Sequence, residues 1–372
     1  MRLLTVNAGS SSLRLALYER RGPELSCLRR AHYEGDIPDD SAPLAELLAE
    51  SPGAIDAVAH RVVHGGRRSR PCRIDAEIER EIREYAVLAP LHNPAALGWI
   101  ARCARHFGAD MTQIAVFDTA FYAHLPPQSA EYALPHELCR EHGLRRYGFH
   151  GSAHAAMWRR WRALRPDLAS GGRVISLQLG AGCSVTATAQ GRAIDTSMGF
   201  TPNEGLMMAT RCGDVDPGLL IHLQRQVGLD VAYLEDLITR RSGLRGVSGL
   251  SDDMRELLGS DEPRAGLAIE MFCYRARKYV GAYLAALGGA DAIVFGGGIG
   301  EHAPGIRARI LDGLEELGIR LDPVRNQSAR GADHRISADA SRIEVHVMAV
   351  DEGQVLAEEA ENLLNIGLRT KD

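Results

Sequence analysis

The chain opens with an alternation of apolar and polar positions that predicts two strands joined by a tight turn. Residues 3–6 are mostly apolar, and leucines recur at every second position of 13–17, the period of a strand with one buried face. The stretch Asn7–Ser12 between them holds only small or polar residues. It is either a plain polar hairpin turn or a turn that closes around a phosphate, because small side chains let backbone N–H groups approach an anion.

Further along the chain, apolar runs alternate with amphipathic stretches, which is typical of an α/β protein. The helix expected at 265–287 is apolar around most of its circumference, so it is expected in the core. Residues 242–255 are expected to form a loop. Strands are expected within 54–66 and at 113–118, 174–179, 185–189, 290–296 and 344–350. Helices are expected at 42–50, 74–87, 95–107, 218–226 and 231–240; three further helices are expected, one that ends at about 164, one that begins at about 304 and one that ends at about 364.

The opening pattern recurs in the middle of the chain. A strand at 174–179 meets Gly180–Ser184 and continues as a second strand at 185–189, so each half begins with a strand, a turn of small residues and a strand. If the halves share a fold, the two turns would face each other across a cleft and could both clasp phosphate. The expected fold is therefore α/β, with two duplicated actin-like (ribonuclease H-like) domains.

Composition narrows the class of protein. A chain of 372 residues suffices for two domains, and a net charge of −5 with a pI near 6.3 argues against nucleic acid or an acidic membrane as a partner. No apolar run approaches the length of a membrane span, and no signal peptide is evident. Seven scattered cysteines without a Cys-x-x-Cys pair favour a reducing, cytoplasmic setting.

Three features are candidates for chemistry. Arg61 interrupts an apolar strand, where it needs either a structural salt bridge or an anionic ligand. Asp118 follows a buried strand directly, so it either caps the next element or contacts a ligand or metal at the strand end. Gly296–Glu301 is either a nucleotide contact or a plain strand-to-helix turn, and it lacks the Lys of a Walker A loop. The pairs His60/His64 and His150/His154 lack the Glu of a zinc-protease helix.

The order and content of the motifs resemble the acetate/propionate/butyrate kinase family, whose fold is the duplicated actin-like one. The match extends from residue 3 to about 360. The matching runs are Asn7–Ser12, His60–Gly66, Pro90–Pro94, Phe117–Phe121, Arg145–Gly151, Asp195–Pro202, Glu204–Met208, Thr210–Arg211, Gly213–Pro217, Gly298–Glu301 and Glu352.

This resemblance implies transfer of the terminal phosphoryl group of ATP to a short carboxylate, giving ADP and an acyl phosphate, with Mg²⁺ or Mn²⁺. Such chemistry needs positioning and charge neutralisation more than covalent catalysis. The implied catalytic residues are Arg61, Asp118, His150 and Arg211. The implied substrate contacts are Arg61, Val63, Leu91, His92, Phe149 and Pro202; the nucleotide or phosphate contacts are Asn7, Ser10, Ser12, Arg14, Gly180, Gly182, Asp253, Arg255, Gly298 and Ile299; and the metal-holding residues are Asp118, Glu352 and Asn7.

Several positions depart from the family pattern. The second turn reads Gln178-Leu-Gly-Ala181-Gly where the family has His-Leu-Gly-Asn-Gly, so an amide is missing at a phosphate-contacting position. Losing one hydrogen bond to a charged group costs roughly 1.5–3 kcal/mol. Asp351 stands where the family has Asn, and Arg14 stands for its usual Lys.

By resemblance, residues 1–119 with about 354–372 form one domain, and 120–353 form a second that binds nucleotide and makes a homodimer. Acetate is the expected acid. A propionate or butyrate kinase, or a catalytically weakened nucleotide-binding paralogue, remains as an alternative. The partners expected are a short carboxylate and ATP.

Overall fold

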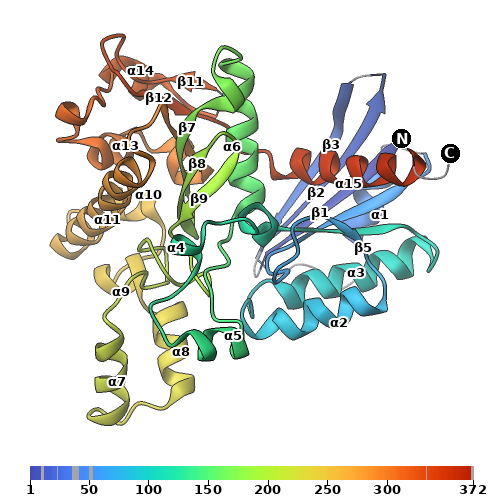
Figure 1. The fold of residues 1–372 in the computed structure, drawn as a ribbon, viewed down its shortest axis with the longest axis horizontal. Coiled ribbons are helices and arrows are strands. Elements are labelled where there is room, and N and C mark those ends of the chain that lie inside the picture. The colour runs from blue at the N-terminus through green and yellow to red at the C-terminus, as the bar shows by residue number, and fades with distance from the viewer. Residues whose placement is uncertain (10–11, 23, 36–41, 50–52, 332, 370–372) are drawn as a thin grey trace. The chain divides into compact units, whose positions relative to one another are not determined.

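The computed structural model describes residues 1–372 apart from 10–11, 23, 36–41, 50–52, 332 and 370–372 (Figure 1). The chain divides into two compact units. The first unit comprises Met1–His124, Phe149–Ala156 and Asp351–Asp372, and the second comprises Leu125–Gly148 and Met157–Val350. The sequence-based division also returns the C-terminus to the first domain; the two divisions differ most in Phe149–Ala156, which the contacts assign to the first unit.

The first unit is built on a six-stranded sheet, counted over the described residues, with the order β3-β2-β1-β4-β6-β5. Strands β1, β4 and β6 are parallel, and β2 is antiparallel to β1. The strands are β1 (Arg2–Ala8), β2 (Ser12–Arg21), β3 (Glu24–Glu34), β4 (Ala57–Val62), β5 (Cys72–Arg73) and β6 (Gln113–Phe117). The helices are α1 (Ala42–Ala49), α2 (Ala76–Glu84), η1 (Tyr85–Val87), α3 (Asn93–Phe107), η2 (Asp118–Tyr122) and α15 (Glu352–Arg369).

Alternating side chains of the strands fill two cores, one on each face of this sheet. On one face, Leu3 and its neighbours pack against Leu356 of α15. On the other face, Leu4 and Val6 pack against α1 and α3, including Trp99. Because β1 is buried on both faces, its run of apolar residues is continuous, as expected for a central strand.

The second unit contains an equivalent six-stranded sheet with the order β11-β12-β10-β7-β8-β9. Helix α6 begins in the first unit and continues into the second. The strands are β7 (Arg173–Leu179), β8 (Cys183–Ala189), β9 (Arg192–Thr196), β10 (Ala292–Gly296), β11 (His334–Arg335) and β12 (Glu344–Val347). The helices are α4 (Pro127–Ala130), α5 (His136–His142), α6 (Gly151–Leu164), η3 (Ala169–Gly171), α7 (Pro217–Arg225), α8 (Val231–Arg240), α9 (Gly243–Ser248), α10 (Met254–Leu258), α11 (Pro263–Leu287), α12 (Gly297–His302), α13 (Pro304–Leu311), η4 (Glu315–Leu317) and α14 (Pro323–Ser328).

The two sheets repeat one topology strand for strand. β7, β8 and β9 take the places of β1, β2 and β3, and β10, β11 and β12 take the places of β4, β5 and β6. The directions agree too, since β7, β10 and β12 are parallel while β8 and β11 run against their neighbours. The duplication expected from two small-residue turns is therefore confirmed by the whole strand order.

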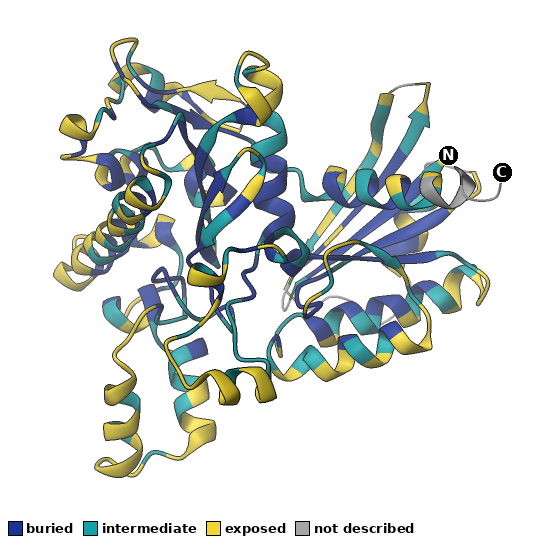
Figure 2. Cartoon of the chain, in the orientation of Figure 1, coloured by how far each residue is buried: buried dark blue, intermediate teal, exposed yellow. Residues whose placement is uncertain are grey.

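Two expectations about the second unit are wrong. Helix α11 is not surrounded by protein: Ile269, Phe272 and Val280 are buried, but Leu267 and Tyr274 are 41% and 60% exposed (Figure 2). The expected loop at 242–255 contains the short helices α9 and α10. Both errors come from judging a segment by its composition, whereas partners elsewhere in the chain decide which face is covered.

Candidate active site

A cluster of charged and amide side chains gathers where three parallel strands of the first unit end. Asn7 lies near the end of β1, Arg61 near the end of β4, and Asp118 directly after β6. Adjacent parallel strands end at one edge of a sheet, which is where ligands collect in α/β proteins. Arg61 Nη1 donates to Asn7 Oδ1 at 3.1 Å, and Arg61 Nη2 to Asp118 Oδ2 at 2.6 Å.

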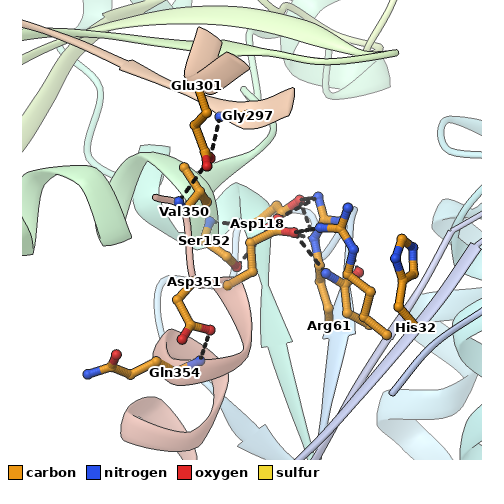
Figure 3. A network of polar contacts seen from close by, with 12 residues as sticks. His32, Arg61, Asp118, Ser152, Gly297, Glu301, Val350, Asp351 and Gln354 are labelled. Carbon is orange, nitrogen blue, oxygen red and sulfur yellow. Dashed lines mark hydrogen bonds and ion pairs between the residues drawn. The ribbon is translucent and has the colours of Figure 1, made fainter. Parts of the chain in front are cut away.

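Asp118 is fully buried and accepts hydrogen bonds on both oxygens (Figure 3). Arg61 Nε lies 3.2 and 3.1 Å from the two oxygens. Ser152, in the first turn of α6, donates to Oδ1 through its hydroxyl at 2.9 Å and its backbone N–H at 3.3 Å. Gly151 permits this approach, because a Cβ there would lie 1.9 Å from the Asp118 carbonyl oxygen. Ser152 is a site residue that the sequence reasoning missed; its position just after the expected His150–Gly151 pair was the available signal.

The second acid of the cluster, Glu352, is the first residue of helix α15. Asn7 Nδ2 donates to Glu352 Oε2 at 2.8 Å, and Arg61 Nη2 lies 3.5 Å from Oε1. Arg14, an exposed residue of β2, is 3.7 Å from Glu352. Two carboxylates thus face one buried guanidinium, and the cluster carries more negative than positive charge among its inner members.

Burial and charge act in opposite directions on the pKa values of Asp118 and Arg61. Burial opposes ionisation of Asp118, but the charge and hydrogen bonds of Arg61, with help from His150 and Ser152, hold the pKa of Asp118 below its usual value. For Arg61, burial lowers the pKa, but Asp118 and Glu352 raise it above its ordinary range. Both groups are therefore charged at neutral pH, and Arg61 has a carboxylate partner within this unit.

His150 precedes α6 in a left-handed backbone conformation, with φ of 58°. Few residues other than glycine adopt this region, and those that do often lie at functional sites. Its neighbour Phe149 accepts a hydrogen bond from the buried Tyr122 hydroxyl at 2.9 Å. One turn later His154 is fully buried, and burial lowers its pKa to about 3 despite the charge of Asp118. His154 is therefore neutral and packs as core.

The residues expected around an alkyl group in this unit are largely apolar and shielded. Val63 and Phe149 are 5% and 1% exposed, whereas Leu91 and His92 are intermediate. The Phe149 ring meets the His64 ring edge-on at 5.4 Å, and His64 stacks on Tyr85. Burial lowers the pKa of His64 to about 4, so the His64 ring is neutral at neutral pH.

The opening turn is described only in part. Gly9 N donates to Ser12 O at 2.7 Å, which closes the hairpin between β1 and β2. Ser12 is half-buried at the start of β2. Ser10, an expected phosphate contact, lies outside the described residues.

In the second unit, Arg211 has a different environment from Arg61. Its Nη1 donates to the Pro202 carbonyl oxygen at 3.1 Å and lies 3.7 Å from Met208 Sδ. Burial lowers the pKa of Arg211, but a guanidinium stays protonated in proteins. Among the residues that the structure describes, no carboxylate pairs with it. Arg211 is thus a desolvated cation whose charge no described carboxylate balances.

The second small-residue turn lies beside the loop that carries Arg211. Gly180 N donates to Gly182 O at 3.2 Å within the turn, and Ala209 N donates to Ala181 O at 3.0 Å. Cys183, fully buried, donates its thiol to Gly180 O at 3.1 Å. Burial raises the pKa of Cys183 to about 12, although Arg211 opposes this shift. The turn, its exposed Ala181 side chain and Arg211 therefore belong to one neighbourhood.

The expected adenosine contacts are also surface features of this unit. Asp253 caps α10 by accepting from Arg255 N at 2.7 Å, and the Arg255 side chain pairs with it while remaining 90% exposed. Gly298 is exposed and Ile299 half-buried. Both lie on helix α12, which directly follows β10. Glu301 of this helix accepts from Gly297 N and from Val350 N, each at 3.1 Å (Figure 3).

The donor set at the end of the first sheet can be tested against a magnesium ion. Carboxylate and amide oxygens are the ligands that Mg²⁺ prefers, and it commonly keeps waters and binds through one or two carboxylates plus substrate phosphates. No described group of three His, Cys, Asp or Glu side chains forms a metal cage, and Asp118 is fully engaged by Arg61 and Ser152. The residues therefore fit a metal held through Glu352, water and nucleotide phosphates.

Together, two six-stranded sheets of one topology place the described part of the chain in the duplicated actin-like class. Residues 42–358 match the Acetokinase family, and this chain belongs to that family. It is therefore a kinase, and membership implies ATP as co-substrate with a divalent metal. None of the helices in the described part of the chain is both long and apolar enough to cross a membrane.

Relatives match over most of the chain. The acetate kinase of Chloroherpeton thalassium is 48% identical over 309 residues, covering 82% of this chain and 74% of that one. The acetate kinase of Methanosarcina thermophila is 37% identical, covering 100% and 99%. The crystal structure of the Porphyromonas gingivalis acetate kinase superposes with a TM-score of 0.86 at 36% identity, covering 98% and 99%. A propionate kinase from Francisella tularensis superposes with a TM-score of 0.85 at 34% sequence identity, covering 96% of this chain and 98% of that one.

Proposed function

We propose that this protein transfers the γ-phosphoryl group of ATP directly to the carboxylate of a short-chain acid, most often acetate, and that the reaction is reversible. The observation that carries the proposal is Arg211, a desolvated guanidinium with no carboxylate partner among the described residues. A guanidinium offers planar paired donors that match a carboxylate or phosphate. An anionic substrate is the partner that this cation lacks.

The groups of the first unit have complementary roles in the proposal. Arg61 would neutralise charge on the carboxylate and the transferring group, while its bonds to Asp118 keep it oriented. His150 would donate to equatorial oxygens of the phosphoryl group as charge develops there. Glu352 would hold Mg²⁺, directly or through water, with Asn7 and Asp118 contacting it through water alone, and that ion would neutralise the nucleotide phosphates.

The remaining contacts would set which nucleotide and acid bind. Phosphates would contact Asn7, Ser10, Ser12, Arg14, Gly180 and Gly182, and adenosine would contact Asp253, Arg255, Gly298 and Ile299. Val63, Leu91, His92, Phe149 and Pro202 would surround the acid. An apolar pocket separates acids that differ by one methylene by only about 1–3 kcal/mol, so propionate should also react, and the propionate kinase relative agrees with this.

The chain is also proposed to work in the cytoplasm, where ATP is available, as a homodimer formed by residues of 120–353. Light scattering of the purified protein measures the mass directly. A monomer at micromolar concentration would contradict the dimer without touching the proposed reaction.

The reaction is tested by incubating the purified protein with Mg-ATP, hydroxylamine and formate, acetate, propionate or butyrate in turn. Acyl phosphate reacts with hydroxylamine, so the expected product is acetohydroxamate, with propionate next. Omitting ATP is the control. No hydroxamate from any acid would reject the proposal. If ADP still bound in calorimetry, that result would support the alternative of a weakened nucleotide-binding paralogue, which the exposed Ala181 favours.

A further inference from the structure

Asp351 stands at the point where the chain passes from the second unit back to the first. It immediately precedes α15, and its Oδ1 accepts a hydrogen bond from Gln354 N at 3.0 Å. A carboxylate in this place satisfies a free N–H group and favours the helix dipole. By itself, this contact would make Asp351 an ordinary helix cap.

Asp351 makes two more contacts that an ordinary cap does not need. The Tyr18 hydroxyl of β2 donates to Oδ1 at 3.1 Å, and Arg30 of β3 pairs with Oδ2. Tyr18 is 1% exposed, and burial and the charge of Asp351 raise its pKa above its usual range, so the hydroxyl stays a donor. The start of α15 is therefore fastened to two strands of the sheet.

The packing around the Tyr18–Asp351 contact leaves no room for a side chain at Gly353. A Cβ at Gly353 would lie 2.8 Å from the Tyr18 hydroxyl oxygen and 3.4 Å from Asp351 Oδ1. Real Cβ atoms do not approach a buried oxygen as closely as 2.8 Å, so the Tyr18–Asp351 contact depends on glycine here. This steric fact is independent of the hydrogen bonds and points to the same arrangement.

Between Asp351 and Gly353 lies Glu352, whose carboxylate meets Asn7 at 2.8 Å and Arg61 at 3.5 Å. We propose that Asp351, held by Tyr18 and Arg30, is a positioning residue that orients the Glu352 carboxylate toward Asn7 and Arg61. This rests on the proposed function, in which Glu352 holds the nucleotide-bound metal. The contacts of the Asp351 oxygens are with Tyr18 of β2, Arg30 of β3 and Gln354, so its role would be exerted through Glu352.

The resembled family has Asn at this position, which sharpens the proposal. An amide oxygen can accept from Tyr18 and from Gln354 N, but a neutral amide cannot pair with Arg30 as a carboxylate does. Asp351→Asn should therefore keep most of the positioning, and Asp351→Ala should lose it. Residues that orient metal-holding groups typically change metal affinity 10- to 100-fold when removed.

The test measures Mn²⁺ binding by electron paramagnetic resonance with saturating ADP, together with melting temperature. Asp351→Ala should weaken Mn²⁺ binding about tenfold and Asp351→Asn less than threefold. Tyr18→Phe keeps the packed ring but removes the hydroxyl, and it should weaken Mn²⁺ binding a few-fold. The matched control is Asp75→Ala, which removes the cap of α2, an acceptor from Ile78 N at 2.9 Å. It should lower only the melting temperature.

A second experiment, in the Glu352→Gln variant, separates the effect of Asp351 on the orientation of Glu352 from its effect on protein stability. In Glu352→Gln protein, adding Asp351→Ala should lower the melting temperature but leave the residual Mn²⁺ affinity unchanged, because the group being aimed is gone. If Asp351→Ala behaves like Asp75→Ala, with unchanged Mn²⁺ affinity, Asp351 is only a cap and the inference is wrong. Absence of Mn²⁺–ADP binding in the native protein also overturns it, whereas binding without hydroxamate formation rejects the proposed reaction alone.

Discussion

The two arginines with proposed catalytic roles have opposite electrostatic environments. Arg61 in the first unit is locked to Asp118 and lies 3.5 Å from Glu352. Arg211 in the second unit has a carbonyl oxygen and a thioether as its contacts. A paired buried charge belongs to the framework, because removing one partner strands the other. A buried charge without a partner can instead bind an anionic ligand. Arg61 is therefore expected to matter for stability, and Arg211 for ligand binding.

The two units also differ in their buried histidines, and this difference gives the largest effect that we expect, on stability in acid. The first unit buries His60, His64 and His154 as neutral rings, with pKa values lowered by burial to about 4, 4 and 3. In the unfolded chain they protonate near pH 6.5. Below that pH the unfolded state binds more protons, so stability falls as pH decreases toward 4, by roughly 3 kcal/mol or more per ring over the window.

The first unit, with three such rings, should therefore unfold in mild acid before the second, in which burial lowers the pKa of His346 against the opposing effect of Glu344 at 2.8 Å. Trp99 reports on the first unit, and Trp158 and Trp161 report on the second. Fluorescence of Trp99→Phe and of the Trp158→Phe/Trp161→Phe variant follows each unit separately. His60→Gln should reduce the slope of unfolding free energy against pH by about 1.4 kcal/mol per unit. Loss of the second unit at the same or a higher pH would refute the contrast.

Arg61→Ala should remove both stability and activity. It leaves the fully buried Asp118 carboxylate with Ser152 as its remaining hydrogen-bond donor, which should cost about 3–5 kcal/mol. Urea unfolding measures the loss, and the hydroxamate assay measures activity.

The control for this change is the double variant Arg61→Ala/Asp118→Asn, in which the stranded charge is neutralised. It should recover part of the stability and none of the activity. If Arg61→Ala alone is as stable as the native protein, the pair is not the framework element that its geometry indicates.

Arg211→Ala should show the reverse pattern, with activity reduced about 1000-fold, as for other arginines that stabilise a transferring phosphoryl group. Its melting temperature should not fall, because the change removes a desolvated charge that the protein does not balance. Arg275→Ala is the matched control: Arg275 bonds the carbonyl oxygens of Cys212 and Asp214 and should keep its activity. A large stability loss in Arg211→Ala would make that arginine structural.

Much of this fold could be inferred from local pattern. Periodicity located most central strands and long helices, and the repeated turn indicated duplication. Strands β3 and β9 were missed because they are outer strands of each sheet with mixed polarity; β3 alternates between exposed and half-buried positions. Their pairing with β2 and β8 decides their conformation, and such partners are not visible in a local window.

The site was harder, for a related reason. Arg61 and Asp118 were expected as ligand contacts, and their closure onto each other depends on adjacent strands ending together. Ser152 could not be distinguished by sequence from the serines that commonly occur near helix starts. Arg211 was expected as a catalytic residue by family resemblance, but its lack of a carboxylate partner among the described residues depends on tertiary packing, which the sequence pattern does not reveal.

The smallest expected effect concerns the second turn. Ala181 is exposed, and its backbone contact with Ala209 N does not involve the side chain, so asparagine fits without rearranging the turn. Ala181→Asn supplies an amide donor beside Arg211 and should raise kcat/KM for ATP about tenfold, the lower end of a hydrogen bond to a charged group, with KM for acetate unchanged. Ala181→Leu, of similar size without the amide, should give no gain. An equal rate in native and Ala181→Asn protein would mean that Arg211 and the turn backbone already bind the phosphate fully, and that the missing amide does not weaken this enzyme.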